Sequence, residues 1–421
     1  MAAPTRPAPG TPIASAYDPL LVAVCTLGLA QITAWGTSYY CLGVLANPIA
    51  DDTGWSRSFI YAGFTLALLV MGAVSPWIGR AIDRYGGRRL MAIGTLTVSA
   101  GLLALSTVTS QATYLAVWVV LGIGMRLSLY DAAFAALVQV VPSRGRLAIS
   151  YLTLFGAFAS TVFWVLGHFL DVALGWRTTL VLFAAINLAV CLPLNWIGLS
   201  RREPREPDEQ ARQTGAAREG PPLQGRARTI AMVLYGLVMS LNALVFGVIS
   251  LQLVQLLEGT GLVTAVAVWV ASMKGFAQFG GRVLELAFAR KLRAITVARI
   301  ALGILPFAFA LLLIAPGSLP AVIGFTVLIG ASQGVVTIVR GALPLALFGA
   351  AGYGAVLGLL AAPILVVSAL APTLFAFVVD RWNWHSAQIA LLGTSSASWL
   401  AIELMARWHD RHRARADGRA Q

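Results

Sequence analysis

Long apolar runs that are nearly free of charge alternate with short charged clusters along these 421 residues, and no other feature constrains the fold as strongly. Hydrophobic residues make up 58% of the chain and charged residues 11%, whereas a soluble domain carries about 25% charged residues. A helix that spans a bilayer needs roughly 20 apolar residues. Because lipid offers the backbone no hydrogen-bond partner, and the runs are too long for barrel strands, each run is predicted to be a helix. The pattern therefore predicts an all-α membrane protein.

Twelve such runs are expected to span the membrane, in two groups of six. Their predicted boundaries are 20–46, 57–79, 90–108, 113–141, 146–170, 178–198, 229–253, 263–287, 295–315, 319–347, 353–379 and 385–405. Charge and proline between the two groups predict a solvated linker at 199–228. The linker would join a first bundle at 20–198 to a second at 229–406, with an N-terminal tail at 1–19 and a basic tail at 407–421.

The distribution of lysine and arginine predicts how the chain is oriented. Most of the net charge of +13 comes from bases in loops beside apolar runs, a placement that encodes membrane orientation rather than binding to nucleic acid. The loops after spans 2, 4, 6 and 8 and the C-terminal tail carry most of them, including Arg84, Arg88, Arg144, Arg146, Arg290, Lys291, Arg411 and Arg413. The opposite loops hold Arg57, Arg177 and Arg381. We therefore expect a multi-pass protein of the bacterial inner membrane, with the linker and both termini in the cytoplasm.

The loop after the second span, Gly79 to Arg89, combines one acid with a cluster of bases, and a weaker copy lies 202 residues downstream. In the copy, the offsets of Gly79, Arg80, Asp83, Arg88, Arg89 and Leu90 are filled by Gly281, Arg282, Glu285, Arg290, Lys291 and Leu292. An acid and bases that recur at fixed spacing in both halves indicate two similar units.

Two groups of six spans, a cytoplasmic linker and this loop resemble the major facilitator superfamily over residues 20–406. The family's loop signature, roughly G-x-x-x-D-R-x-G-R-R/K, is matched, with one extra glycine, by Gly79, Asp83, Arg84, Gly86 and Arg88-Arg89. The resemblance implies two pseudo-symmetric six-helix bundles. It also implies that these residues, with Glu285 of the copy, form a latch that holds the halves together in the outward-facing state. The simpler interpretation is that the loop only signals orientation.

Finer features of the resemblance bear on the branch of the family. The sequences Gly54-Trp55-Ser56-Arg57 and Gly175-Trp176-Arg177 look like those of bacterial members near the monocarboxylate and oxalate–formate branch. Span 5 lacks the Gly-Pro-x-x-Gly-Gly signature of drug–proton antiporters. A multidrug exporter is therefore less favoured. Asp83 has a physical role open to it, because a carboxylate can accept from backbone N–H groups at the positive start of a neighbouring helix.

Four ionisable residues lie well inside predicted spans: Arg126 and Asp131 in span 4, Lys274 in span 8 and Arg340 in span 10. A charge costs a few kcal/mol at mid-bilayer, so such residues should face protein or water and are functional candidates. Arg126 and Asp131 are five residues apart, a spacing that does not pair side chains within one helix. Asp131 is expected either to carry a proton or to serve as a counter-ion to a cationic side chain.

Polar and aromatic side chains at helical spacing mark candidate cavity walls on spans 1, 4, 7 and 10, which line the central cavity in the family that the chain resembles. These candidates are Gln31, Trp35, Tyr39, Arg126, Tyr130, Asn242, Gln333, Thr337 and Arg340. Lys274, Gln278 and Arg282 form a further stripe on span 8, of which Lys274 is the candidate for substrate binding. Such stripes also arise from helix packing alone. The four ionisable residues inside the spans are three cations, Arg126, Lys274 and Arg340, and one carboxylate, Asp131, so the interior carries a net positive charge. Arginine is well suited to bind a carboxylate.

These patterns favour a secondary transporter that moves a small organic anion by alternating access, coupled to protons or to a counter-solute. Efflux of drug-like or toxic compounds is an alternative, as is a non-transporting receptor or sensor on the same fold. No ATP-binding P-loop and no catalytic cluster occur, so neither a pump nor an enzyme is expected. Cys25, Cys41 and Cys191 show no disulfide or metal spacing. We expect no cofactor or metal, and a monomer surrounded by lipid.

Overall fold

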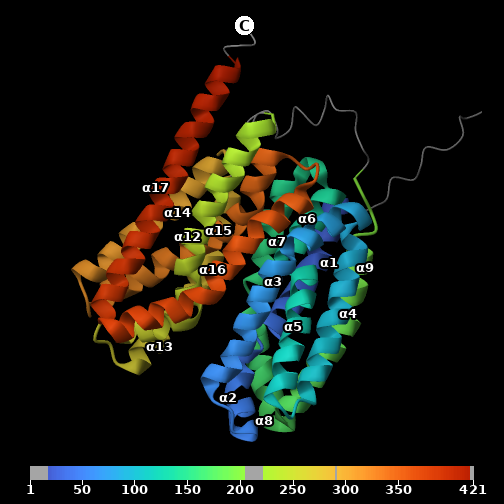
Figure 1. Ribbon diagram of the computed structural model, residues 1–421, viewed down its shortest axis with the longest axis vertical. Helices are drawn as coiled ribbons and strands as arrows, with labels where there is room; N and C mark the ends of the chain where they lie inside the picture. Colours follow the sequence, from blue (N-terminus) through green and yellow to red (C-terminus); the bar gives the residue numbers. More distant parts are fainter. Residues whose placement is uncertain (1–17, 204–220, 290–291, 418–421) are drawn as a thin grey trace, which may run out of the picture.

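The computed structural model describes residues 18–203, 221–289 and 292–417, and the regular elements in these ranges are all helices (Figure 1). Arg290, Lys291, linker residues 204–220 and tail residues 1–17 and 418–421 lie outside the described residues. The helices before the linker, here the first half, are α1 (Pro19–Ala34), η1 (Trp35–Tyr39), α2 (Leu42–Thr53), α3 (Arg57–Tyr85), α4 (Gly87–Ser106), α5 (Gln111–Ser128), α6 (Tyr130–Val140), η2 (Pro142–Arg144), α7 (Gly145–Gly156), α8 (Ala159–Ile186), η3 (Asn187–Cys191) and α9 (Leu192–Gly198). Those after it, the second half, are α12 (Gly225–Glu258), α13 (Thr264–Phe288), α14 (Ala294–Ile314), α15 (Leu319–Phe348), α16 (Tyr353–Arg381) and α17 (Trp384–Asp417).

Ten helical segments in the described ranges are long and apolar enough to cross a membrane. One of them, Pro142–Gly198, runs over 57 residues, which is far longer than a bilayer is thick at about 1.5 Å per residue. Gly175 divides it, because its φ of 78° and ψ of 161° are not helical. α13 is not one of the ten, and it carries three ionisable residues of the second half. The fold is therefore that of a multi-pass helical membrane protein, while the count of twelve crossings stays a prediction.

The helices of the first half gather on one side of the molecule and those of the second half on the other (Figure 1). Buried apolar side chains follow a similar division. One cluster draws only on residues 223–406, whereas the other two are built mainly from residues 20–199 with a few side chains from α15 and α16. α3 packs directly against α16 between the halves. At this contact a Cβ on Gly79 would lie 2.2 Å from the carbonyl oxygen of Gly354, so only glycine allows the approach.

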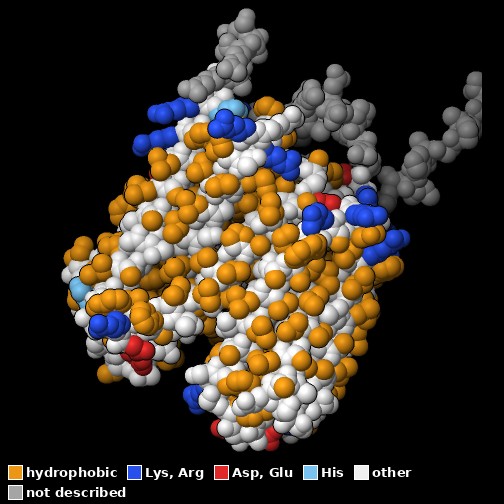
Figure 2. All heavy atoms as spheres, in the orientation of Figure 1, with side chains coloured by type: hydrophobic (Ala, Val, Ile, Leu, Met, Phe, Trp, Pro, Cys, Tyr) orange, Lys and Arg blue, Asp and Glu red, His pale blue; other side chains and the backbone are white. Residues whose placement is uncertain are grey.

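The halves meet closely on one side, here called the linker side because residues 199–203 and 221–224 lie there. Arg146 of α7 donates to the carbonyl oxygens of Leu292 and Ala289 at 2.8 and 3.2 Å. Arg282 of α13 donates to the carbonyl oxygen of Thr153 at 2.6 Å. On the opposite side the surface is hollowed between the halves (Figure 2). The molecule is therefore closed on the linker side and open on the other.

Candidate functional site

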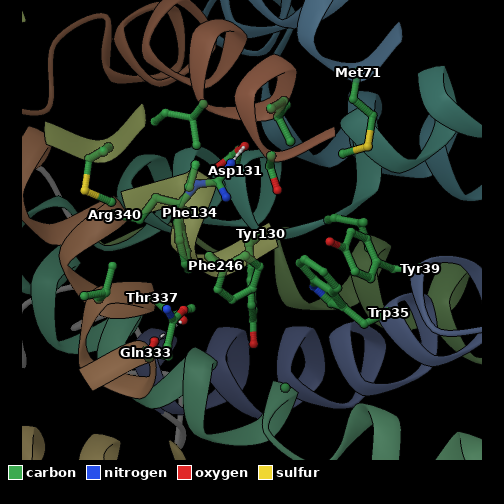
Figure 3. Close-up of a pocket in the computed structure, with 18 of the residues that line it drawn as sticks. Trp35, Tyr39, Met71, Tyr130, Asp131, Phe134, Phe246, Gln333, Thr337 and Arg340 are labelled. Carbon is green, nitrogen blue, oxygen red and sulfur yellow. Dashed lines mark hydrogen bonds and ion pairs between the residues drawn. The ribbon is translucent and has the colours of Figure 1, made fainter. Parts of the chain in front are cut away.

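A cavity of about 130 Å³ lies between the two halves, and its wall is formed by side chains from both (Figure 3). The charged and amide residues in the wall are Arg126, Asp131, Asn242, Gln278, Arg282, Gln333 and Arg340. The aromatic residues are Trp35, Tyr39, Tyr40, Tyr130, Phe134 and Phe246. The cavity thus combines three guanidinium groups and one carboxylate with a wall of rings.

A break in the fourth span places two of these charges. α5 ends at Ser128 and α6 starts at Tyr130, because Leu129 between them has an extended conformation with φ −85° and ψ −170°. Arg126 lies in the last turn of α5 and Asp131 in the first turn of α6. The C-terminal end of a helix is partially negative and the N-terminal end partially positive, so both charges have favourable positions. The helix expected to be continuous in this span is therefore interrupted at Leu129, between the two charged residues that line the cavity.

The side chain of Gln31 on α1 stabilises this break through a hydrogen bond to the backbone of α5. The backbone N–H of Ala132 bonds to the carbonyl of Leu129, which leaves the carbonyl of Ser128 without its helical partner. Gln31 Nε2 donates to that Ser128 oxygen at 2.8 Å, and its Oε1 accepts from Trp35 Nε1 at 3.1 Å. The Gln31 side chain is fully buried. Its amide therefore connects the break in span 4 to an aromatic residue of the cavity wall.

Asp131 and Arg340 form an ion pair inside the cavity, with 2.8 Å between Asp131 Oδ2 and Arg340 Nη2. The Asp131 side chain is 8% exposed and that of Arg340 is 27% exposed. Asp131 belongs to α6 and Arg340 to α15, so the pair joins the two halves. Its members are the two groups in the wall whose charges cancel most directly.

Arg126 differs from Arg340 in that its hydrogen-bond partner is a hydroxyl group and not a carboxylate. Its Nε donates to Ser75 Oγ of α3. Its Nη1 is buried and has no hydrogen-bond partner among the described residues. The side chain is 2% exposed, and it lies within range of the charges of Asp131 and Arg340. Arg126 is part of the cavity wall, and a guanidinium with an unpaired N–H group is suited to bind an anionic group.

Four other wall residues carry buried polar atoms that have no hydrogen-bond partner in the described part of the chain. These atoms are Tyr130 Oη, Asn242 Oδ1, Arg282 Nε and both amide atoms of Gln333. An unsatisfied buried polar atom costs about 1–3 kcal/mol. Their convergence on one cavity indicates a space that receives a polar ligand or water.

The aromatic part of the wall starts in the first span, where η1 is a π-helix, an irregularity frequent at functional sites. The ring of Trp35 lies 4.8 Å from that of Tyr39 and 4.9 Å from that of Tyr130, measured between centroids. Tyr130 stacks on Phe134 at 5.2 Å and 10°. Figure 3 shows Trp35 and Tyr39 together on the right of the view and Tyr130 and Phe246 at its centre. Phe246 comes from α12 of the second half.

The cavity contains most, but not all, of the residues predicted to line it. Trp35, Tyr39, Arg126, Tyr130, Asp131, Asn242, Gln333, Thr337 and Arg340 are in its wall. Gln31 and Lys274 are not. The amide of Gln31 is occupied by Ser128 and Trp35. Lys274 Nζ instead lies 3.4 Å from the carbonyl oxygen of Ile249 on α12.

Arg282 is the main charged wall residue that was not proposed as a cavity residue from sequence. It shares a helical stripe with Lys274 and Gln278, and it matches Arg80 in the copied loop. Gln278 and Arg282 both line the cavity. The stripe is the feature of the sequence that could have identified Arg282, because it marks one face of α13. Helical spacing does not show how far along that face the cavity extends. Tyr40 and Phe134 give no signal beyond being aromatic, whereas Phe246 follows Asn242 by four residues and shares its predicted face of span 7.

On the linker side, Asp83 makes the kind of contact expected from the sequence. Its carboxylate accepts from the backbone N–H groups of Gly354 and Ala355, at 2.9 and 2.7 Å. Both groups lie in the first turn of α16, in the other half. A carboxylate at this position interacts favourably with the helix dipole.

Glu285, the counterpart of Asp83 in the copied loop, also reaches across to the other half. It is buried and accepts from Ser150 Oγ at 3.1 Å and from Arg146 Nη2 at 3.4 Å, both on α7. The internal repeat of the sequence thus corresponds to two acids that each contact the early turns of a helix in the opposite half.

The other members of the predicted latch contact their own half. The guanidinium of Arg84 lies 5.2 Å from the ring centre of Tyr85, and that of Arg88 lies 3.9 Å from the ring centre of Trp196. Gly86 has a φ of 88° where α3 ends and α4 begins. Among the predicted loop residues, Gly79 and Asp83 therefore contact the second half directly.

Comparison with known proteins relates this architecture to transporters. The family model described as Major Facilitator Superfamily matches residues 27–313. The uncharacterized MFS-type transporter YcxA of Bacillus subtilis (strain 168) is 28% identical over 161 residues, which are 36% of this chain and 38% of that protein. This match therefore spans well under half the length of that relative.

Two solved transporters are similar over nearly their whole length. The human organic anion transporter MFSD10 (TETRAN) superposes with a TM-score of 0.71 and 17% identity, over 92% of this chain and 100% of that one. FucP in the outward conformation superposes with a TM-score of 0.69 and 12% identity, over 92% and 99%. A second FucP structure, described as the E. coli fucose:proton symporter, gives 0.65 and 13% over the same shares. At these identities the likeness is one of fold.

Proposed function

This chain belongs to the major facilitator superfamily, and from that premise we propose that it is a secondary active transporter for a small organic anion. The family and the fold are those of transporters and not of enzymes. The observation that carries the proposal is Arg126, which lines the cavity between the halves and whose buried Nη1 has no hydrogen-bond partner among the described residues.

Alternating access is the mechanism that best fits the placement of the cavity. A site between two repeats can be exposed to either side when one half rocks against the other. The close contacts on the linker side and the hollow on the opposite side support one of the two end states. With the linker in the cytoplasm, as the placement of Arg and Lys favours, this state is the outward-facing one.

The charges of the wall favour an anion over a neutral or cationic solute. Three arginines and one aspartate line the cavity, and arginine stays protonated in proteins. After Asp131 pairs with Arg340, positive charge is left in excess. A carboxylate near Arg126 would reduce that excess, whereas a cationic drug would add to it.

The ion pair offers a route to proton coupling. Protonation of Asp131 would remove its charge and free Arg340 for a second contact with the bound anion. Proton and anion would then bind together and cross together, as symport requires. Exchange against a counter-solute is the other coupling mode open to this site, with the counter-solute displacing the anion from Arg126 and Arg340.

Uptake into proteoliposomes tests the function. Vesicles with purified protein and preloaded unlabelled acid are given labelled benzoate, lactate or L-fucose outside. We expect exchange of at least one of the two acids, and its loss in Arg126→Gln with normal protein incorporation. Exchange of L-fucose alone, or of none of the three, would contradict an organic anion as substrate.

A further inference from the structure

We propose that the cavity selects planar aromatic carboxylates that carry a hydroxyl group on the ring, opposite the acid. This inference rests on the proposed transport function and names the substrate class of the same site. Three features of the wall carry it: a guanidinium with an unpaired N–H group, aromatic rings, and unpaired amides.

The first feature determines where the carboxylate of the ligand binds. Arg126 Nη1 is buried and unpaired in the described part of the chain, close to the Asp131–Arg340 pair. A carboxylate binds a guanidinium through short charge-assisted hydrogen bonds. The acid end of the ligand therefore lies beside Arg126.

The second feature determines the shape of the ligand between its two ends. Six aromatic side chains belong to the wall, and rings prefer stacked or edge-to-face contacts at centroid distances of about 4.5–7 Å. The ring of Trp35 already contacts those of Tyr39 and Tyr130 within that range. Phe246 of α12 adds a ring to the same wall from the second half (Figure 3). A flat ring fits against these surfaces, whereas a puckered aliphatic ring makes fewer contacts. Aromatic walls also attract cations, but the excess of arginine opposes that choice.

The third feature determines which group the ligand carries at the end opposite its carboxylate. Gln333 has an unpaired donor and an unpaired acceptor, and Asn242 has an unpaired acceptor, in the described structure. A hydroxyl group can accept from Gln333 Nε2 and donate to one of the two amide oxygens, so it satisfies both kinds of atom. Gln333 lies two turns before Arg340 on α15, roughly 10 Å along the helix. Figure 3 shows the rings of Tyr130 and Phe246 at a level between Gln333 and the Arg340–Asp131 pair.

Binding to the purified full-length protein tests the class, with four matched probes measured by isothermal titration calorimetry. The probes are 4-hydroxybenzoate, benzoate, cyclohexanecarboxylate and 4-hydroxybenzyl alcohol. We expect 4-hydroxybenzoate to bind most tightly and benzoate next. Cyclohexanecarboxylate should bind about 2- to 10-fold more weakly than benzoate, and the uncharged alcohol should not bind measurably.

Two variants assign the contacts. Gln333→Leu should reduce the advantage of 4-hydroxybenzoate over benzoate, and Phe246→Leu should reduce that of benzoate over cyclohexanecarboxylate. Trp269→Leu is the matched control, because Trp269 is 55% exposed on α13 and does not line the cavity. It should leave all four affinities unchanged.

The outcomes separate this inference from the proposed function. Equal affinity for benzoate and cyclohexanecarboxylate overturns the aromatic class and leaves transport of an organic anion standing. An unchanged preference for the hydroxyl group in Gln333→Leu overturns the placement of the far end. Binding of the alcohol but of no acid, or no binding by any probe, contradicts both.

Discussion

Asp131 of α6 and Arg340 of α15 lie 2.8 Å apart and join the two halves of the protein at its central cavity. A buried ion pair is strongly destabilised when one partner is lost, because the other charge is left uncompensated. A ligand that separates this pair must therefore leave neither the Asp131 carboxylate nor the Arg340 guanidinium buried without a partner. An anion can approach Arg340 only in competition with Asp131, unless Asp131 takes up a proton.

Arg126 should contribute more to binding than Arg340, because Arg340 is already paired with Asp131. We expect Arg126→Lys to weaken binding of an organic anion by about 1.5–3 kcal/mol, or about 10- to 100-fold in Kd, since lysine keeps the charge but loses the planar fork. Arg340→Lys should have a smaller effect. Lys274→Ala is the control outside the cavity and should change Kd least. An order in which Lys274→Ala costs most would contradict this site.

Gln31 should stabilise the protein through the break in span 4. Replacement by leucine leaves the Ser128 carbonyl and the Trp35 N–H without partners, so Gln31→Leu should lower the free energy of unfolding by about 1–3 kcal/mol. Gln333→Leu is the matched control, because Gln333 is also a buried glutamine but its side-chain amide has no hydrogen-bond partner among the described residues. Thermal unfolding in detergent should separate the two variants, and an equal change in Tm would remove the structural role of Gln31.

The contact between α3 and α16 should control opening on the linker side. Gly79→Leu would place a bulky side chain against the Gly354 carbonyl and should shift the protein toward a state open on that side. A cysteine in place of Ser368 in the cavity wall should then react less from the opposite side. Gly275→Leu is the control, since a Cβ there meets no atom within 4 Å.

Asp83→Asn should act in the same direction as Gly79→Leu, but more weakly. It removes a charge from the start of α16, where the dipole interaction is worth about 0.3–1 kcal/mol. Labelling of Ser368→Cys in this background should fall about 2- to 5-fold. Unchanged labelling and unchanged transport in both variants would reduce the loop to an orientation signal.

Orientation can be measured with one cysteine on each side. In a background that lacks Cys25, Cys41 and Cys191, Asp51→Cys should react with an impermeant thiol reagent in intact cells. Arg84→Cys should react only after the membrane is permeabilised. Both positions are exposed in the structure. The reverse pattern would place the linker side outside the cell.

The helical architecture and most of the cavity could be predicted from sequence, because both depend on patterns that lie within single helices. Apolar runs predict spans, and the stripe Gln333, Thr337 and Arg340 predicts one face of α15. The same reasoning failed for Lys274, because spacing identifies a face but not the depth at which a neighbouring helix covers it. The carbonyl of Ile249 on α12 lies 3.4 Å from the Lys274 ammonium.

The break at Leu129 could not be predicted, because neither proline nor glycine marks it in the sequence from Arg126 to Asp131. Its stability depends on tertiary contacts, above all on the bond from Gln31 to Ser128. Asp131 was recognised as needing a partner, but spacing could not tell which cation would meet it. That choice is made by the packing of α6 against the second half.

Accumulation driven by a pH gradient in proteoliposomes tests most directly whether the Asp131–Arg340 pair links the proton to the anion. Wild-type protein should accumulate a labelled organic acid that it also exchanges at equal concentrations. Asp131→Asn mimics the protonated carboxyl group and should lose the accumulation while it keeps the exchange, which also shows that the variant is folded. Gradient-driven accumulation that persists in Asp131→Asn would contradict the account.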